Sequence, residues 1–260
     1  MTLALEPVSQ IGGLNVVVLG EGGPVTVFAH GLGGSVAETR PLATRVEGTR
    51  VLFDFPGHGD SVDLQGGWHY DLLADALLAV ADAYGATQAV GLSMGAGALL
   101  RALSRDPKRF AKLAFVLPAA IDGTRRDGAT ERLQILGDAI VNGDADAAAE
   151  FLLGELPASV RERRGIEVLV RRRAAQVVAK PAPAPSYDDR PLHDRSLFSA
   201  LDVPTLVVGQ EADALHPLDL ALELHSLMPS ADLAVYPQAG VFWTAAREAQ
   251  EALARHLSET

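Results

Sequence analysis

The chain has 260 residues, of which 48% are hydrophobic and 21% are charged, and its net charge is −11. This length and composition are typical of a globular α/β protein with a large buried core, and they exclude a disordered or fibrous chain. The acidic balance argues against nucleic-acid binding, and the absence of cysteine excludes disulfides, thiolate metal sites and a cysteine nucleophile.

Targeting and membrane signals are not visible in the sequence. The segment from Met1 to Glu6 has neither the basic region nor the long apolar region of a signal peptide. No run approaches the roughly 18 apolar residues of a membrane span. We therefore expect a cytoplasmic protein that binds no nucleic acid, membrane, cofactor or metal, and the oligomeric state stays open.

Short apolar runs recur along the chain, with helical patterns between them. The runs 15–19 and 24–29 are joined by a glycine-rich segment and predict a hairpin. Further runs suit strands that are buried on both faces, and they lie at 50–53, 87–92, 112–117, 205–208 and 233–236. This alternation predicts an α/β fold with a mostly parallel, eight-stranded sheet and helices on both faces.

Two helices can be placed from their end signals. Leu73, Leu77, Val80 and Tyr84 recur at helical spacing, and Gly85 is expected to end that helix. The last segment, 244–258, predicts a closing helix with Thr244 as its N-cap.

The stretch from about 121 to 190 interrupts the alternation. It is helical in pattern and rich in Ala and Arg, and it ends with proline at every second position over 180–185, which favours an extended connector. We predict that 1–121 is the first half of the core, 122–190 a helical cap with a Pro-rich return, and 191–260 the second half of the core.

One motif indicates a catalytic serine. Residues 91–95 read Gly-Leu-Ser-Met-Gly, a G-x-S-x-G pattern that directly follows a predicted strand and precedes a predicted helix. In that context the serine is forced onto a sharp, exposed turn between strand and helix, with small residues where the helix must pass close to the strand. Ser93 is therefore predicted to occupy a nucleophile position.

Two further loops accompany this elbow. The first contains His30 and Gly31 and leads into a glycine-rich turn, and the second runs from Asp54 to Ser61 and contains His58. A third loop, after the run 205–208, is acidic and contains Glu211, Asp213 and His216. A loop of this kind alone would usually be a solvated turn.

In chain order the His30-Gly31 loop, the 54–61 turn, the elbow and the acid loop resemble the α/β-hydrolase superfamily over nearly the whole chain except the cap. The resemblance implies that Ser93 is the nucleophile, that Asp213 is the triad acid, and that the backbone N–H groups of Leu32 and Met94 form an oxyanion hole. It also implies that His30 and Gly31 lie in the substrate-binding loop and that His58 is structural. Glu211 and Asp122 are alternative acids.

The resemblance fails at the general base. The family's histidine follows the eighth strand, and Val241 occupies that position here. Valine cannot accept a proton, and a serine hydroxyl depends on an adjacent base. His216 and His193 are the candidate substitute bases, although His216 would reach Ser93 only if its loop folds back over the cleft.

The other histidines have ordinary interpretations. His69 is expected to cap or pack at the start of a helix. His225 and His256 are expected near helix C-termini, where a positive charge is favoured.

A group of arginines lies in a short part of the predicted cap, at positions 161, 163, 164, 171, 172 and 173. They would clamp a carboxylate or phosphate of a substrate, or they form a solvated helix face beside neighbouring glutamates. The pattern favours the solvated face.

Three functions remain open on the sequence. The first is an enzyme with an incomplete triad that acts on a small acyl compound by elimination, decarboxylation, cyclisation or isomerisation. The second is a serine esterase, thioesterase or lactonase whose base is displaced or removed. The third is a binding protein that senses a small ligand without catalysis.

Overall fold

The computed structural model describes residues 9–64, 66–123, 129–179 and 189–258. Within them one sheet contains eight strands in the order β1-β2-β4-β3-β5-β6-β7-β8. The strands are β1 (Ser9–Ile11), β2 (Leu14–Leu19), β3 (Val25–Ala29), β4 (Thr49–Phe53), β5 (Gln88–Leu92), β6 (Lys112–Val116), β7 (Thr205–Gln210) and β8 (Ala231–Tyr236). The predicted fold class is confirmed.

In the spatial order of the sheet, the strands β4, β3, β5, β6, β7 and β8 pair in parallel. The pairs β1–β2 and β2–β4 are antiparallel. The predicted hairpin of 15–19 with 24–29 is wrong, because β4 lies between β2 and β3. The glycine-rich link crosses the start of β4, where the N–H of Thr49 donates to the carbonyl of Gly22 at 3.0 Å. A short link between two apolar runs therefore does not decide whether the runs pair.

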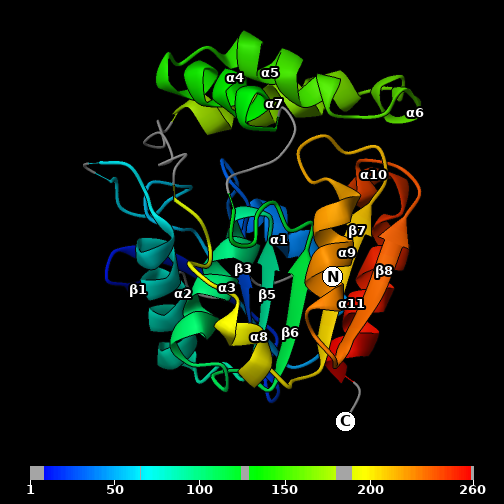
Figure 1. The fold of residues 1–260 in the computed structure, drawn as a ribbon. Coiled ribbons are helices and arrows are strands. Elements are labelled where there is room, and N and C mark those ends of the chain that lie inside the picture. The colour runs from blue at the N-terminus through cyan, green and yellow to red at the C-terminus, as the bar shows by residue number, and fades with distance from the viewer. Residues whose placement is uncertain (1–8, 65, 124–128, 180–188, 259–260) are drawn as a thin grey trace.

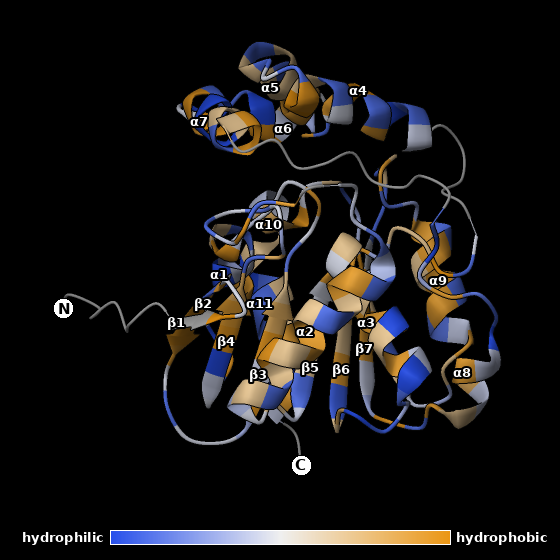
Figure 2. Ribbon diagram, turned by 90° about the vertical axis from the view of Figure 1, so that its left-hand side faces the viewer, coloured by the Kyte–Doolittle hydropathy of each residue, from blue (hydrophilic) through white to orange (hydrophobic). Residues whose placement is uncertain are grey.

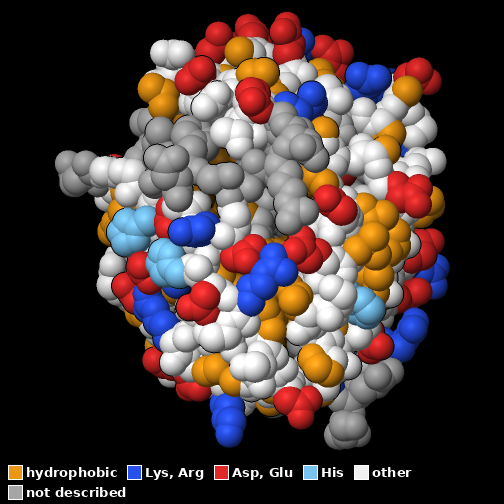
Figure 3. Space-filling view, viewed as in Figure 1, with side chains coloured by type: hydrophobic (Ala, Val, Ile, Leu, Met, Phe, Trp, Pro, Cys, Tyr) orange, Lys and Arg blue, Asp and Glu red, His pale blue; other side chains and the backbone are white. Residues whose placement is uncertain are grey.

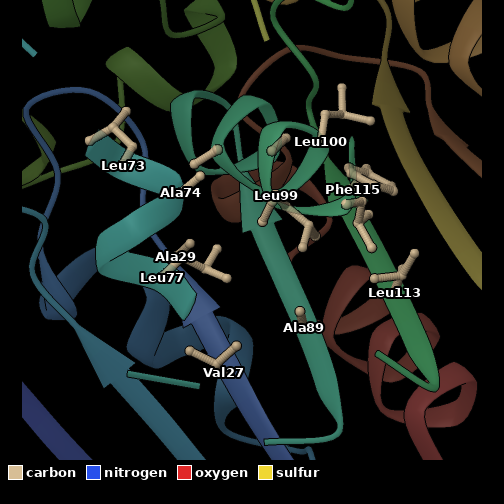
Figure 4. Close-up of a cluster of buried hydrophobic side chains, with 14 of the residues drawn as sticks. Val27, Ala29, Leu73, Ala74, Leu77, Ala89, Leu99, Leu100, Leu113 and Phe115 are labelled. Carbon is tan, nitrogen blue, oxygen red and sulfur yellow. The ribbon is translucent and has the colours of Figure 1, made fainter. Parts of the chain in front are cut away.

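Helices cover both faces of the sheet (Figure 1). The helices of the core are α1 (Val36–Ala43), α2 (Tyr70–Tyr84), α3 (Met94–Arg105), α8 (Ser196–Ala200), α9 (Leu218–Ser226), α10 (Val241–Thr244) and α11 (Ala246–Ser258). Alternate strand residues face opposite sides, as the pleat requires. Val27 and Phe115 pack with α2 and α3 (Figure 4), whereas Phe28 and Val116 pack with α1 and α11.

A second layer of helices lies across the end of the sheet at which β5, β6 and β7 finish (Figure 1). It comprises α4 (Ala129–Val141), α5 (Ala145–Gly154), α6 (Ala158–Arg161) and α7 (Ile166–Ala179), and we call it the α4–α7 layer. It has small apolar cores of its own. These helices fall inside the predicted cap, whose exact boundaries stay a prediction because the proline tract lies outside the described residues.

The helix ends test three predictions. Gly85 ends α2 in the left-handed conformation, with φ of 62°, and the His69 ring accepts the N–H of Leu72 at 3.2 Å as the N-cap of α2. Both predictions are confirmed. Thr244 is not the N-cap of the closing helix, because it ends α10, where its hydroxyl donates to the carbonyl of Gly240 at 3.1 Å.

The surface agrees with the composition. Most core helices carry both hydrophobic and hydrophilic residues, as expected of helices with one face on a sheet (Figure 2). On the face shown in Figure 3, acidic and basic side chains are interspersed over the described residues. None of the described helices is long and apolar enough to cross a bilayer.

Candidate active site

Ser93 lies on a strained turn between β5 and α3. Its backbone has φ of 50° and ψ of −108°, a region that L-residues rarely adopt, and its N–H donates to the carbonyl of Val116 at 3.0 Å. A β-carbon on Gly91 would lie 2.5 Å from the carbonyl oxygen of Gly95, and one on Gly95 would lie 2.4 Å from that of Ala29. The two glycines therefore let the helix pass close to two strands, and the predicted elbow is confirmed as a conformation.

The ring of His216 lies between Ser93 and Asp213. Its Nε2 is 2.9 Å from the Ser93 hydroxyl oxygen, and its Nδ1 is 2.8 Å from Oδ2 of Asp213. The side chain of His216 is 17% exposed and that of Asp213 only 7%. With Nδ1 protonated and donating to the carboxylate, Nε2 is free to accept the serine proton, which is the arrangement of a Ser-His-Asp triad.

The acid loop folds back because Asp213 organises the backbone that follows it. Its Oδ1 accepts the N–H of Leu215 at 2.8 Å and the N–H of His216 at 3.0 Å, which closes a tight turn. Ala212, just before it, has φ of 56° in the left-handed region. This turn returns the His216 ring to the Oδ2 atom of the same carboxylate.

Electrostatics keep Asp213 ionised. Burial by itself raises the pKa of this carboxyl, but the nearby His216 ring and hydrogen bonds from His216 and Gln210 outweigh it. The net effect holds the pKa of Asp213 well below its usual range. A carboxylate in this state can orient the histidine and stabilise the imidazolium that forms when serine loses its proton.

Of the two candidate substitute bases, His216 is the one that contacts Ser93, and its loop folds back over the cleft as that contact requires. Val241, at the family's usual base position, is fully buried at the start of α10 and lines the same cavity. The N–H of Val241 donates to the side-chain oxygen of Gln210 at 2.8 Å, and the nitrogen of that side chain donates to Asp213. Gln210 thus joins the loop after β8 to the acid.

The second candidate base, His193, lies elsewhere. It is exposed, its Nε2 is 2.9 Å from Nη1 of Arg101, and it is not among the described residues that line the cavity. The alternative acid Asp122 forms an ion pair with Arg195, and Glu211 is exposed outside the cavity.

The prediction for His30 needs correction, because this side chain is fully buried and does not line the cavity. Its Nε2 accepts the N–H of Phe55 at 2.9 Å, so Nδ1 carries the proton and donates to the carbonyl of Gly31 at 2.7 Å. Burial lowers the pKa of His30 and favours this neutral form. His58 is also buried, with Nδ1 3.1 Å from the carbonyl of Pro56, in keeping with the structural interpretation.

The two amides predicted for an oxyanion hole flank the elbow. Leu32 directly follows Gly31, and Gly31 lies close to Ser93. A β-carbon added to Gly31 would be 3.4 Å from the Cβ of Ser93. Met94 is the first residue of α3, where amides have no helical acceptor. Over the described residues, neither N–H donates a hydrogen bond within the protein.

A cavity of about 420 Å³ opens between the core and the α4–α7 layer and contains Ser93, Asp213 and His216 in its wall. Gly31 and Leu32 line it, as predicted for the loop. Apolar side chains form most of the rest, and they come from both layers: Leu117, Leu133, Leu136, Phe151, Leu152, Leu156, Leu169, Val170, Val177, Leu215, Val241, Phe242 and Trp243.

Of the arginine group, one member enters this cavity. Arg173 lines it and forms an ion pair with Glu38, whereas Arg171 pairs with Glu167 and Asp146 on the surface of α7 and α5. Arg161, Arg164 and Arg172 are exposed. The interpretation as a solvated face holds for these residues, and Arg173 is the exception.

The sequence interpretation did not identify Gln210 or Glu38 as parts of the site. Gln210 is the last residue of β7, and the carboxyl ends of parallel strands face the site. Its position in the sequence could therefore have predicted that it lies near Asp213. Glu38 carried no such signal, because it lies within α1 and contacts the loop only in the folded protein, where it also lines the cavity.

Comparison with known proteins agrees with this architecture. The model of the alpha/beta hydrolase family matches residues 26–256. A 2-hydroxy-6-oxononadienedioate/2-hydroxy-6-oxononatrienedioate hydrolase from Burkholderia vietnamiensis is 28% identical over 247 residues, which cover 85% of this chain and 82% of that protein.

Solved structures share the fold at low identity. A meta-cleavage product hydrolase from Pseudomonas fluorescens superimposes with a TM-score of 0.75 at 17% identity, covering 98% of each chain. An enol-lactonase from Burkholderia xenovorans gives a TM-score of 0.75 at 18% identity, covering 97% of this chain and 100% of its own. The chain belongs to the alpha/beta hydrolase family and is an enzyme of that fold.

Proposed function

We propose that this enzyme is a serine hydrolase of uncharged carboxylic esters, thioesters or lactones, in which His216 is the general base. The observation that carries the proposal is the position of the His216 ring, with Nε2 2.9 Å from the Ser93 hydroxyl and Nδ1 2.8 Å from Asp213. These distances are those of a nucleophile, a base and an orienting acid in hydrogen-bond contact.

In this proposal the base has moved from the loop after β8 to the loop after β7. His216 and Asp213 then belong to a single turn, which the two backbone N–H bonds to Asp213 stabilise. Val241 at the family's usual base position becomes part of the apolar wall. The triad is complete in its chemical groups, although not in its usual places along the chain.

The reaction follows from this arrangement. Nε2 of His216 takes the Ser93 proton while the serine oxygen attacks the substrate carbonyl carbon, and the N–H groups of Leu32 and Met94 stabilise the negative oxygen. His216 then gives the proton to the leaving alcohol or thiol, and an acyl-serine remains. Water repeats the sequence on the acyl-serine and releases the acid, restoring the free hydroxyl of Ser93.

The lining of the cavity supports an uncharged substrate. The walls are mainly apolar, and the cationic side chain of Arg173 is already paired with Glu38. Glu155, also in the wall, pairs with Arg132. The Burkholderia vietnamiensis relative is named for dioate substrates, which carry two carboxylates. A carboxylate buried here would face Glu38 and Glu155 among the described residues, without a free cation, and burial of an unpaired charge is costly.

A fluorophosphonate probe and an ester test this proposal directly. The probe phosphonylates an activated serine, with fluoride as the leaving group and His216 as the proton acceptor. We expect labelling of Ser93 and hydrolysis of p-nitrophenyl hexanoate by the wild-type enzyme, and neither by Ser93→Ala. His216→Ala is expected to lower kcat by about 10⁴ to 10⁶-fold, as loss of a triad histidine does.

His193→Ala is the matched control, because it removes an exposed histidine outside the cavity. It should keep kcat within about two-fold, as a surface change away from a site normally does. If the probe does not label the wild type, and if wild type and Ser93→Ala hydrolyse the ester equally, the protein is not a serine hydrolase. That result would favour non-hydrolytic chemistry.

A further inference from the structure

Glu38 holds the loop that carries one predicted oxyanion donor. It lies on α1, and its Oε2 accepts the N–H of Gly31 at 2.9 Å. Its other oxygen, Oε1, accepts Nη2 of Arg173 from α7 of the α4–α7 layer. The Glu38 side chain is only 15% exposed and that of Arg173 is 45% exposed. One carboxylate thus contacts the catalytic loop on one side and the overlying helices on the other.

The loop is shaped around this carboxylate. A β-carbon on Gly34 would lie 2.2 Å from Oε2 of Glu38, and one on Gly31 would lie 3.3 Å from the same atom. A side chain at position 34 would therefore force the carboxylate to move, and glycine lets the two approach closely. The α4–α7 layer contacts the same turn, since a β-carbon on Gly33 would lie 3.2 Å from Val177 of α7.

These contacts fix the direction of the Leu32 N–H. The carbonyl of Gly31 accepts the N–H of Gly34 at 3.0 Å and Nδ1 of His30 at 2.7 Å, while the N–H of Gly31 is held by Glu38. In a trans peptide the N–H of the next residue points opposite to the carbonyl. With both polar backbone atoms of Gly31 held, the peptide that presents the Leu32 N–H cannot rotate freely.

We infer that Glu38 is a positioning residue for the oxyanion loop and that Arg173 neutralises it, so that the α4–α7 layer takes part in stabilising the transition state. The inference rests on the proposed hydrolase function. Burial alone raises the pKa of Glu38, but the nearby Arg173 guanidinium and the hydrogen bond from the Gly31 N–H lower it, and on balance this pKa is lowered, so the group is an anion. An unpaired anion next to the loop that carries the Leu32 N–H would oppose the negative charge that develops on the substrate oxygen. Arg173 offsets that repulsion.

The test compares catalysis with binding of an alkyl boronic acid, which forms a tetrahedral anionic adduct on an activated serine. Glu38→Ala should lower kcat for p-nitrophenyl hexanoate and weaken boronate affinity together, each by about 10 to 100-fold, with KM changed by less than about three-fold. Removing one oxyanion donor lowers kcat by roughly 10² to 10³-fold. The expected loss in Glu38→Ala is smaller, because the Leu32 N–H is displaced and not removed.

Arg173→Met tests the charge separately at a partly exposed position. It should lower kcat by about ten-fold, and the double variant Glu38→Gln with Arg173→Met should regain part of that loss, because an amide oxygen still accepts the Gly31 N–H without a charge. Arg171→Met, on the same helix but outside the cavity, is the matched control and should leave kcat unchanged within about two-fold. Circular dichroism melts of each variant check that it is folded.

Two failures are distinguishable. If the wild type hydrolyses the ester and binds the boronate while Glu38→Ala keeps both within about two-fold, the positioning role is wrong and the hydrolase stands. A purely structural role would lower the melting temperature and leave kcat and boronate affinity of the folded fraction unchanged, which also overturns the inference. If the wild type does neither, the proposed function fails, and this inference fails with it.

Discussion

The side-chain oxygen of Gln210 accepts the backbone N–H of Val241 at 2.8 Å. Gln210 is the last residue of β7, and Val241 opens α10 after β8, so the bond joins the loop after β7 to the loop after β8. The nitrogen of the same side chain donates to Asp213. The loop after β8 therefore contacts Asp213 indirectly, through the backbone amide of Val241 and the Gln210 side chain.

Replacing Val241 by His tests whether this enzyme needs a base at the usual place. We expect no gain in kcat for p-nitrophenyl hexanoate, because His216 already accepts the single proton of the Ser93 hydroxyl. Val241 is fully buried, so a larger polar ring should also lower the free energy of unfolding by about 1–3 kcal/mol. Steady-state kinetics and urea unfolding check both parts. A large gain in kcat would mean that His216 is not the working base.

The lowered pKa of Asp213 predicts a pH-dependent contribution to stability. A carboxylate whose folded pKa is depressed stabilises the fold above its unfolded pKa, near 4, and the contribution is lost as pH falls through the folded value. We expect Asp213→Asn to lower the free energy of unfolding by about 1.5–3 kcal/mol near pH 7, the range for hydrogen bonds to a charged group, and the difference from wild type to narrow below about pH 4.

Urea unfolding of wild type and Asp213→Asn between pH 3 and 7 measures that difference. The exposed Asp232, replaced by Asn, is the control and should give a small difference at every pH. A gap between wild type and Asp213→Asn that does not change with pH would contradict an ionised, stabilising Asp213.

A matched pair of substrates tests the neutral cavity. p-Nitrophenyl hexanoate and the mono-p-nitrophenyl ester of adipic acid have acyl chains of the same length, and only the second ends in a carboxylate. We expect kcat/KM to favour the neutral ester by about 10 to 100-fold, since each factor of ten corresponds to about 1.4 kcal/mol of unfavourable charge burial. Glu155→Gln, which removes one wall carboxylate, should narrow the gap. A preference for the charged ester would show that the cavity binds dioate-like substrates.

Glycine replacements test the elbow against a matched position. Gly95→Ala would place a β-carbon 2.4 Å from the carbonyl oxygen of Ala29, so we expect loss of ester turnover and destabilisation by about 2 kcal/mol or more. Gly154 lies at the end of α5, and a β-carbon added there would meet no other atom within 4 Å. Gly154→Ala should therefore leave the melting temperature unchanged or raise it slightly. Thermal melts and p-nitrophenyl hexanoate kinetics separate the two. Equal behaviour would mean that the close packing at the elbow is not required.

The fold and the elbow could be predicted because their signals are local. Apolar runs at strand length, Gly85 after a helical pattern and the glycines around Ser93 each act on their own segment of chain. The prediction of a hairpin was wrong because β4, a strand later in the sequence, inserts between β2 and β3, and local patterns do not encode such an insertion. The predicted substrate-binding position of His30 was wrong because a His-Gly pattern is compatible both with a ring in the cavity and with a ring buried beneath the loop. Only the burial of the side chain in the folded protein distinguishes the two.

The sequence by itself determined the α/β sheet and the position of the turn at Ser93, because backbone preferences, apolar periodicity and the flanking glycines encode them. Only the tertiary structure decided which group faces Ser93. His216 and Ser93 are 123 residues apart, and their contact depends on a turn that Asp213 closes with its own carboxylate. Spacing along the chain cannot predict such a contact, because it arises where two loops meet at the end of the sheet.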